Sequence, residues 1–274
     1  MDAVRERELL DRLGAPPAGR FAEVNGFELY YEVHGAGAPL LLLHGFTQAG
    51  VAWQPYLPAF TGSYRVIVPD LRGHGRSTNP SGKFTHRQSA EDVAALLDHL
   101  DIDRCCALGF STGGMTLLHL ATRRPERIER MIVISSTSYY PEQARAIMRD
   151  LDPDRLRDEA NDELRKIHHR GEEQVYALRR QFHEFKDSYE DMNFTGPLLA
   201  TIQAPTLIVH GDRDDFFEVG IPVEMYRAIP DSYLWIVPNG GHGLLRELSR
   251  DDAGSFRRAA LAFLRGAWAA SSDG

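Results

Sequence analysis

A serine between two glycines carries the clearest chemical signal in this chain. An apolar, strand-like run at 105–108 leads into Gly-Phe-Ser-Thr-Gly at 109–113, and a helix-like run at 115–121 follows. A sharp turn from strand to helix lifts the central serine above the sheet edge, where a base can reach its hydroxyl. There the helix N-terminus also faces developing negative charge. The pattern therefore predicts that Ser111 is a nucleophile.

A serine hydroxyl is a poor nucleophile unless a base takes its proton and a third group orients that base. His242 lies in the loop Asn-Gly-Gly-His-Gly at 239–243, directly after the apolar run 234–237. His44 and His210 also end apolar runs and are the alternatives. His44 precedes a turn whose backbone is needed for a different part of the site, described below, and His210 adjoins an acidic loop. We favour His242 because it completes the nucleophile, acid, base order of one hydrolase type.

The orienting acid should come from a loop between nucleophile and base, at the end of a strand. Gly-Asp-Arg-Asp-Asp at 211–215 follows the apolar run 206–209. Asp214 matches a Gly-x-x-Asp pattern after the strand, with Asp212 or Asp215 as substitutes. The loop lacks the further ligands of a calcium site. We expect neither a metal ion nor an organic cofactor.

Acyl chemistry also needs an oxyanion hole, in which two backbone N–H groups face the oxygen of the tetrahedral intermediate. Losing one such donor raises the barrier by about 3 kcal/mol. The N–H of Thr112, just past the serine at the predicted helix start, is one candidate. The loop His-Gly-Phe-Thr-Gln at 44–48 offers the other, and the N–H of Phe46 is the favoured donor.

Continuous apolar runs alternate with amphipathic helices over most of the chain, which predicts a parallel sheet covered on both faces. Catalytic groups then lie beyond the carboxyl ends of the strands. The segments 21–24 and 27–33, joined by Asn-Gly, predict a β-hairpin at the start. The predicted strands are 39–43, 66–68, 105–108, 131–134, 206–209 and 234–237, and two predicted helices are 88–100 and one that carries Phe256, Ala260, Phe263 and Leu264.

One segment, from Ser136 to about Leu199, breaks this alternation and contains only charged, helical sequence. Helices are predicted at 141–151, 153–171 and 172 to about 192. We interpret the segment as a helical cap inserted after a core strand. The predicted domain organisation is an N-terminal extension helix within 1–20, a core at 21–135 and 200–268, and a cap at 136–199.

Aromatic and methionine side chains near the site are candidates for the substrate pocket. The candidates from the cap are Tyr139, Tyr140 and Met148, and Trp53 follows the oxyanion loop shortly after. Pockets for small molecules are lined mainly by such residues. The same residue types also pack a cap onto a core, so both roles stay open.

Three further histidines are predicted to be structural or solvent-exposed. His74, in Gly-His-Gly at 73–75, is interpreted as a loop histidine that hydrogen-bonds to backbone. His168 and His169 are neighbours on a charged helical stretch and point in different directions. They are predicted to lie on a solvated face.

Composition narrows the class of protein. The chain has 274 residues, of which 43% are hydrophobic and 26% charged, and a net charge of -8. This charge disfavours nucleic acid or an anionic membrane as the main partner. The adjacent Cys105 and Cys106 would point to opposite faces of a strand, so a disulfide between them is not expected.

The N-terminal sequence does not match a secretory signal. Residues 1–8 alternate in charge where an apolar stretch would be needed, and 2–13 predicts a short amphipathic helix. No apolar run approaches the ~20 residues that cross a bilayer. We therefore expect a cytoplasmic protein without a membrane span.

Four motifs in this order resemble the α/β-hydrolase superfamily over about Phe21 to Leu264. The resemblance implies a mostly parallel eight-stranded sheet with an inserted helical cap. It also implies a triad of Ser111, Asp214 and His242 and oxyanion donors at Phe46 and Thr112. The motifs are His-Gly-Phe at 44–46, Asp-Leu-Arg-Gly-His-Gly-Arg-Ser at 70–77, Gly-Phe-Ser-Thr-Gly-Gly at 109–114, and Gly-Asp-Arg-Asp at 211–214 followed by Gly-His at 241–242.

Departures from other members narrow the subclass. Haloalkane dehalogenases and epoxide hydrolases of this superfamily carry aspartate where this chain has Ser111. Cofactor-free haloperoxidases typically have proline where this chain has Thr47. Carbon–carbon bond hydrolases usually have a more glycine-rich loop there, and prolyl aminopeptidases surround their serine with other residues. The leading prediction is a serine esterase or lactonase that acts on a small-molecule ester through an acyl-enzyme.

Two other functions stay open from the sequence. One is acyl transfer to another acceptor, or perhydrolysis as in cofactor-free haloperoxidases, on the same fold. The other, from a different class, is a non-catalytic ligand receptor, against which the complete set of serine, base and acid counts. The oligomeric state is not indicated.

Overall fold

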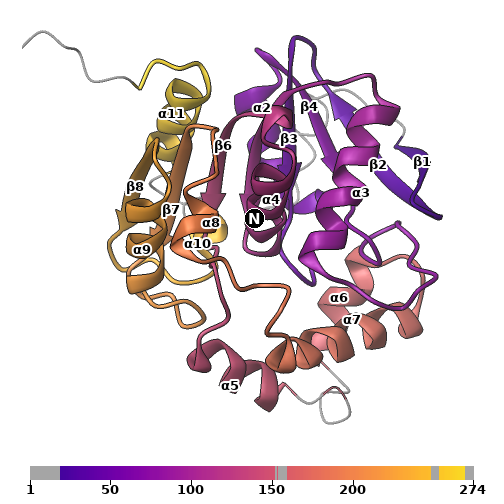
Figure 1. Ribbon diagram of the computed structural model, residues 1–274. Coiled ribbons are helices and arrows are strands. Elements are labelled where there is room, and N and C mark those ends of the chain that lie inside the picture. The colour runs from indigo at the N-terminus through magenta and orange to yellow at the C-terminus, as the bar shows by residue number, and fades with distance from the viewer. Residues whose placement is uncertain (1–18, 152, 154–158, 248–252, 269–274) are drawn as a thin grey trace, which may run out of the picture.

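The computed structural model describes residues 19–151, 153, 159–247 and 253–268. Eight strands form one sheet in the order β1-β2-β4-β3-β5-β6-β7-β8 (Figure 1). β2 pairs antiparallel with β1 and β4, and every other pair in the sheet is parallel. The predicted α/β class and mostly parallel eight-stranded sheet are therefore confirmed.

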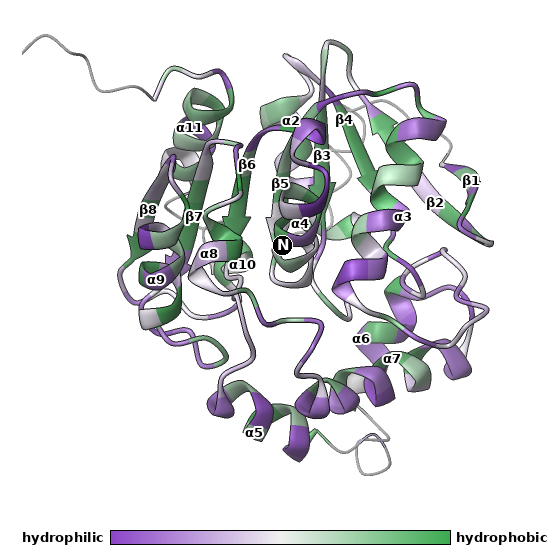
Figure 2. Cartoon of the chain, viewed as in Figure 1, coloured by the Kyte–Doolittle hydropathy of each residue, from purple (hydrophilic) through white to green (hydrophobic). Residues whose placement is uncertain are grey.

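The predicted apolar runs all lie in strands, and the side chains on both faces of the central strands are buried. Figure 2 shows these central strands coloured mainly as hydrophobic residues. The predicted hairpin is present as β1 and β2, with Asn25 and Gly26 at positive φ in its turn. The strands are β1 (Arg20–Val24), β2 (Phe27–His34), β3 (Ala38–Leu43), β4 (Tyr64–Pro69), β5 (Cys105–Phe110), β6 (Ile128–Ile134), β7 (Thr206–Gly211) and β8 (Ser232–Val237).

Helices cover both faces of the sheet, and each layer encloses its own hydrophobic cluster. Both cysteines in β5 are free and buried, as expected. One face carries α3 (His86–His99), α4 (Thr112–Arg123), α8 (Gly196–Leu199) and α9 (Gly220–Ala228). The other carries the 3-10 helix η1 (Gly50–Tyr56), α2 (Leu57–Phe60) and α11 (Ala253–Leu264), and two short helices, η2 (Pro125–Arg127) and α10 (Leu244–Glu247), lie in connections.

The segment from Ser136 to Leu199 is called the cap segment below. Its helical part at 142–184 lies beyond the carboxyl ends of the parallel strands, at the bottom of Figure 1. The cap segment contains α5 (Glu142–Asp150), α6 (Glu159–Ile167), α7 (Glu172–Glu184) and the 3-10 helix η3 (Phe185–Asp187), before α8. The third cap helix was predicted to reach about residue 192 and ends earlier. The guanidinium of Arg145 donates to the carbonyls of Lys186 and Ser188, which a continuing helix would have used.

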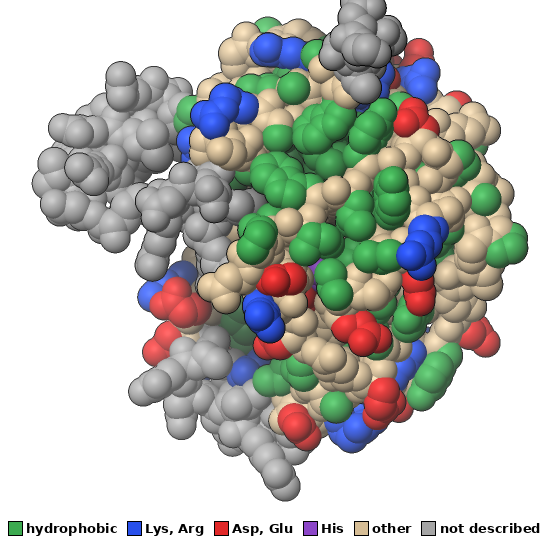
Figure 3. Space-filling model, turned by 90° about the vertical axis from the view of Figure 1, so that its left-hand side faces the viewer, with side chains coloured by type: hydrophobic (Ala, Val, Ile, Leu, Met, Phe, Trp, Pro, Cys, Tyr) green, Lys and Arg blue, Asp and Glu red, His purple; other side chains and the backbone are tan. Residues whose placement is uncertain are grey.

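β8 forms one edge of the sheet, on a face where hydrophobic side chains gather (Figure 3). The rings of Tyr233 and Trp235 pack against Phe263 and Phe256 of α11, with centroids 5.9 and 6.3 Å apart. α11 therefore covers one side of this edge strand.

The predicted N-terminal helix at 2–13 lies outside the described residues. Among the helices that are described, none is both long and apolar enough to cross a bilayer.

Candidate active site

Ser111 lies in the turn between β5 and α4 with φ of 50°, a conformation that is uncommon for a residue with a side chain. Its N–H donates to the carbonyl of Ile134 in β6 at 2.8 Å. The turn is too tight for side chains at two of its glycines. A Cβ on Gly109 would lie 2.4 Å from the backbone of Gly113, and a Cβ on Gly113 would lie 2.2 Å from the carbonyl oxygen of Leu43. This crowding explains the Gly-x-Ser-x-Gly spacing.

Ser111, His242 and Asp214 form a continuous hydrogen-bonded chain. His242 Nε2 lies 3.2 Å from Ser111 Oγ, and His242 Nδ1 lies 2.9 Å from Asp214 Oδ2. The second carboxylate oxygen, Oδ1, accepts from the N–H groups of Phe216 and Phe217 at 2.9 and 3.0 Å. Because the carboxylate accepts the proton on Nδ1, Nε2 is left as the acceptor that faces the serine hydroxyl.

Asp214 is held in its charged form despite its position inside the protein. Burial raises the pKa of Asp214, but the hydrogen bond and charge of His242 outweigh it, together with the N–H of Phe217, so the pKa lies below the usual value. A charged Asp214 is suited to stabilise an imidazolium at His242.

In the described residues, none of the alternative bases and acids hydrogen-bonds to Ser111. His44 is fully buried with both ring nitrogens bonded to backbone groups, and burial lowers its pKa to about 3. His210 is also fully buried and donates from Nε2 to the carbonyl of Phe217. Asp212 and Asp215 are exposed. The structure therefore brings together the three residues favoured from the sequence. Of the four substitutes, His210 lies beside them, with its Nε2 3.6 Å from Asp214 Oδ2.

The two expected oxyanion donors flank the serine. Thr112 is the first residue of α4, so its N–H has no acceptor within that helix. Phe46 lies in a turn closed by the N–H of Gln48 and the carbonyl of Gly45, 3.1 Å apart. Within the described part of the chain, neither N–H has a hydrogen-bond acceptor. Both residues border the cavity that contains Ser111.

A cavity of about 360 Å³ opens at Ser111 and His242, between the sheet and the cap segment. Its size is near the lower end for small-molecule sites. The walls are mostly aromatic and aliphatic, and they include two of the predicted pocket residues, Tyr140 and Met148. The remaining side chains of the wall are mainly Phe46, Phe110, Met115, Leu164, Ile167, Phe182, Phe185, Phe216, Phe217 and Leu245.

Trp53 and Tyr139, also proposed for the pocket, do not border this cavity. Trp53 lies in η1, on the face of the sheet opposite to α3 and α4, and is fully buried against Tyr56. Tyr139 forms an isolated antiparallel bridge with Asn193, which joins the two ends of the cap segment. The positions of Trp53 and Tyr139 depend on which face of the sheet the chain follows after β3 and after β6. A single sequence does not show this.

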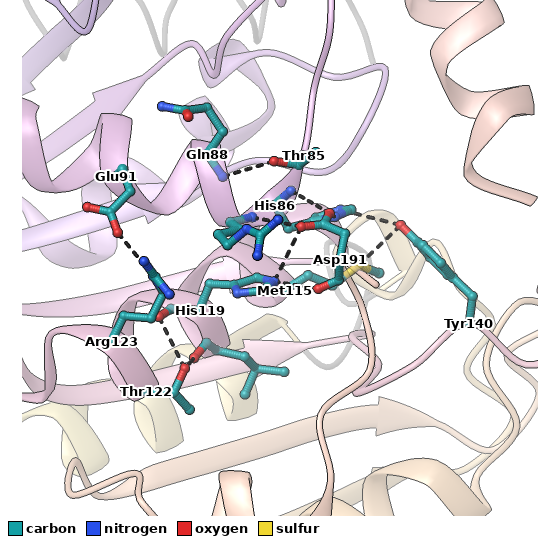
Figure 4. Close-up of polar contacts among 12 residues, drawn as sticks. Thr85, His86, Gln88, Glu91, Met115, His119, Thr122, Arg123, Tyr140 and Asp191 are labelled. Carbon is teal, nitrogen blue, oxygen red and sulfur yellow. Dashed lines mark hydrogen bonds and ion pairs between the residues drawn. The ribbon is translucent and has the colours of Figure 1, made fainter. Parts of the chain in front are cut away.

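Tyr140 is positioned by a buried polar cluster at the start of α3 (Figure 4). The Asp191 carboxylate accepts from the backbone N–H of His86 and of Arg87 at 2.7 and 3.1 Å, and from His86 Nδ1 at 2.7 Å. Burial raises the pKa of Asp191, but these interactions with His86 outweigh it and bring the pKa to about 2. His86 Nε2 faces the Tyr140 hydroxyl at 3.4 Å. The cluster thus links the end of the cap segment to the cavity wall.

Of the predictions for His74, His168 and His169, two are confirmed and one is wrong. His74 donates from Nδ1 to the carbonyl of Arg72 at 3.0 Å and is fully buried, which confirms a backbone-bonded loop histidine. His169 is exposed. His168 was predicted to be solvated, and this is wrong, because only 2% of it is exposed. It follows the last residue of α6, so the helical periodicity that placed it on the surface no longer applies there.

No metal site accompanies these groups in the described residues, where no three His, Cys, Asp or Glu side chains are grouped to hold an ion.

A soluble epoxide hydrolase of Corynebacterium sp. strain C12 is 36% identical over 113 residues, which are 41% of this chain and only 40% of that enzyme. A solved structure of Est816, described as an N-acyl homoserine lactone degrading enzyme, superposes with a TM-score of 0.67. It is 27% identical over 89% of this chain and 100% of its own. The enol-lactonase of Burkholderia xenovorans LB400 is 25% identical, with a TM-score of 0.70 over 90% of this chain and 100% of its own.

A family model described as alpha/beta hydrolase fold matches residues 38–193, which include β3, the serine turn and most of the cap segment. The sheet order, the position of Ser111 after β5 and the cap beyond the strand ends agree with this match. The chain belongs to the alpha/beta hydrolase fold family.

Proposed function

We propose that this protein is a serine hydrolase that cleaves a carboxylic ester or a lactone through an acyl-enzyme intermediate. The observation that carries the proposal is the chain from Asp214 through His242 to Ser111, whose hydroxyl borders an apolar cavity. A serine at this position supports acyl transfer to the hydroxyl oxygen. Similarity to two lactone-cleaving structures supports the same class.

In the first half of the proposed reaction, Ser111 Oγ attacks the carbonyl carbon while His242 Nε2 accepts the hydroxyl proton. The N–H groups of Phe46 and Thr112 donate to the oxyanion. The ester C–O bond then breaks, and His242 gives the proton to the departing alcohol. Ser111 is left acylated.

In the second half, His242 takes a proton from water, and the hydroxide oxygen adds to the acyl carbon. The tetrahedral intermediate collapses, the bond to Ser111 Oγ breaks, and His242 returns the proton to the serine. The products are a carboxylic acid and an alcohol, or a hydroxy acid from a lactone.

The cavity favours an uncharged, apolar substrate of limited size. Its wall consists largely of phenylalanine, leucine and methionine side chains, which bind hydrocarbon surface. A volume of about 360 Å³ suits short or medium acyl groups or a small ring better than a long chain. We therefore expect turnover to fall from short towards long acyl chains.

A panel of p-nitrophenyl esters from acetate to palmitate, together with several lactones, tests the proposal. Wild-type protein should hydrolyse the shorter esters, and Ser111→Ala should remove turnover while the protein stays folded. Ser89→Ala is a matched control, because it removes a buried hydroxyl in α3 that has no hydrogen-bond partner in the described residues. Full activity in Ser111→Ala would exclude the proposed mechanism.

Product analysis separates hydrolysis from the related reactions. With added alcohols or hydrogen peroxide in the assay, the free carboxylic acid should remain the main product. A new ester or a peracid as the main product would assign acyl transfer or perhydrolysis instead. Tight ligand binding without turnover of any ester or lactone would favour a receptor.

A further inference from the structure

The oxyanion loop, residues 44–48, contains a strained residue. Thr47 has φ of 60°, although it is β-branched, and follows the expected donor Phe46 in the turn closed by Gly45 and Gln48. Glycine adopts such a φ readily, whereas a β-branched residue at positive φ is a conformational outlier. Strained residues of this kind persist when the surrounding structure holds them. Contacts to Thr47 from outside the loop can therefore hold it in this conformation.

His168, from the turn between α6 and α7, supplies such a contact. Its Nδ1 accepts from the backbone N–H of Gly75 at 2.9 Å, and its Nε2 lies 3.2 Å from the carbonyl oxygen of Thr47. Nδ1 is therefore the acceptor, and Nε2 carries the proton that it donates to Thr47. A neutral imidazole in one tautomer satisfies both contacts, and burial lowers the His168 pKa to about 4, which keeps the ring neutral near pH 7.

The turn that carries His168 is docked on the core independently of Thr47. The N–H of His169 donates to the carbonyl of Gly75 at 3.1 Å. Gln174 Nε2, at the start of α7, donates to the carbonyls of Gly73 and Gly75 at 2.9 and 3.0 Å. These bonds fix the position from which His168 reaches the oxyanion loop.

We propose that His168 is a positioning residue that holds the oxyanion loop in its strained conformation through the carbonyl of Thr47. Docking of the cap segment on the 73–75 loop is thereby coupled to the assembly of the oxyanion hole. The inference rests on the proposed function, in which the N–H of Phe46 is an oxyanion donor. If the Thr47 carbonyl is released, the turn relaxes and the N–H of Phe46 moves from its working position.

Two amide substitutions separate the two contacts of the ring. His168→Gln carries an amide N–H at the reach of Nε2 and keeps a donor for Thr47. His168→Asn is shorter and keeps only an acceptor near Nδ1, for Gly75. We expect His168→Asn to lower kcat by about 10- to 100-fold with KM within about threefold, since small displacements of catalytic groups have effects of this size. His168→Gln should keep kcat within about threefold of wild type.

Two further variants distinguish positioning from a general loosening of the cap. Gln174→Ala removes two docking bonds but leaves the bonds of His168 and His169 to Gly75, which suffice to place His168, so kcat should stay within about threefold. Thr47→Gly relieves the strained φ, so adding His168→Asn to it should lower kcat much less than in the wild-type background. Thermal unfolding of each variant identifies any that fails to fold.

A trifluoromethyl ketone inhibitor provides a readout that stability alone does not move. It adds to Ser111 and forms an oxyanion, so its affinity should fall in His168→Asn in parallel with kcat/KM and stay near wild type in His168→Gln. Three results would overturn the inference. They are a wild-type kcat in His168→Asn, a loss of kcat in Gln174→Ala as large as in His168→Asn, and a loss of kcat from His168→Asn that is as large in the Thr47→Gly background as in wild type. Absence of Ser111-dependent turnover in wild type would instead refute the proposed function, and the inference with it.

Discussion

The Ser136 hydroxyl donates a hydrogen bond to the backbone carbonyl of Ser111, with 2.7 Å between the two oxygens. Ser136 is the first residue of the cap segment, and the N–H of Met115 in α4 donates to the same carbonyl at 3.0 Å. A Cβ on Gly114 would lie 2.0 Å from Ser136 Oγ. The first residue of the cap segment thus packs directly against the serine turn. Substitutions that add a side chain to this turn should therefore destabilise the fold.

Gly113→Ala should destabilise the protein by at least about 2 kcal/mol. The new Cβ would lie 2.2 Å from the carbonyl oxygen of Leu43 in β3, and this backbone atom cannot move without disturbing the central sheet. Urea unfolding followed by circular dichroism measures the change. Gly196→Ala is the control, because no atom lies within 4 Å of its new Cβ, and it should stay within about 0.5 kcal/mol of wild type. Equal stabilities of the two variants would contradict the crowded turn.

Asp214→Asn should lower kcat by on the order of ten-thousand-fold, with little effect on folding. The amide no longer selects the imidazole tautomer whose Nε2 accepts from Ser111, nor does it stabilise the imidazolium. Steady-state kinetics on a short p-nitrophenyl ester measures the loss. Asp212→Asn, at an exposed position in the same loop, should leave kcat unchanged. A similar loss in both variants would indicate a requirement for the loop and not for one carboxylate.

His119→Gln should change how stability depends on pH. Burial lowers the pKa of His119 to about 4, whereas in the unfolded chain it lies near 6.5. Between these values only the unfolded chain binds the proton, so this histidine lowers stability as pH falls from about 6.5 to 4, and its contribution is fully retained above that range.

The glutamine does not titrate, so the stability of His119→Gln relative to wild type should improve as pH falls. The improvement is at most about 1.4 kcal/mol per pH unit. Gln can still donate to the carbonyl of Asp191, as His119 Nε2 does at 2.7 Å. Urea midpoints between pH 4.5 and 7.5 measure the effect. A constant difference between the two proteins over this range would show that His119 is not held neutral.

Met148→Trp should shift the acyl-chain preference towards acetate. Met148, in α5, is buried in the cavity wall, and an indole there would occupy volume otherwise open to the acyl group. The ratio of kcat/KM for hexanoate to that for acetate should fall by at least about tenfold, because each excluded methylene forfeits about 0.8 kcal/mol. Leu198→Trp, at an exposed position in α8, should leave the ratio unchanged. An unchanged ratio in Met148→Trp would place the acyl group elsewhere.

The strands and the triad could be predicted from the sequence because their signals are local. The apolar runs that became β3 to β7 are largely buried on both faces. A strand buried in this way is apolar along its whole length, and this pattern can be recognised without knowledge of its neighbours. Gly109, Gly113 and the residues after β7 and β8 occur where a parallel sheet must place its catalytic groups. Neither signal depends on long-range packing.

The parts that were not predicted depend on tertiary contacts. α7 ends at Glu184 because Arg145, about forty residues earlier, binds the following carbonyls. His168 is buried because its turn docks on Gly75, nearly a hundred residues away. Helices η1 and α9 were not predicted. Such contacts are invisible to patterns that extend over a few residues.

The most direct test of the central claim is to trap the acyl-enzyme. Wild-type protein is mixed with excess p-nitrophenyl butyrate, quenched in acid within milliseconds to seconds, digested and analysed by mass spectrometry, with Ser111→Ala as control. The mass of one butyryl group should appear on the peptide that contains Ser111, together with a burst of p-nitrophenol, and neither should appear in Ser111→Ala. Butyryl on another residue, or hydrolysis that continues in Ser111→Ala, would contradict Ser111 as the nucleophile.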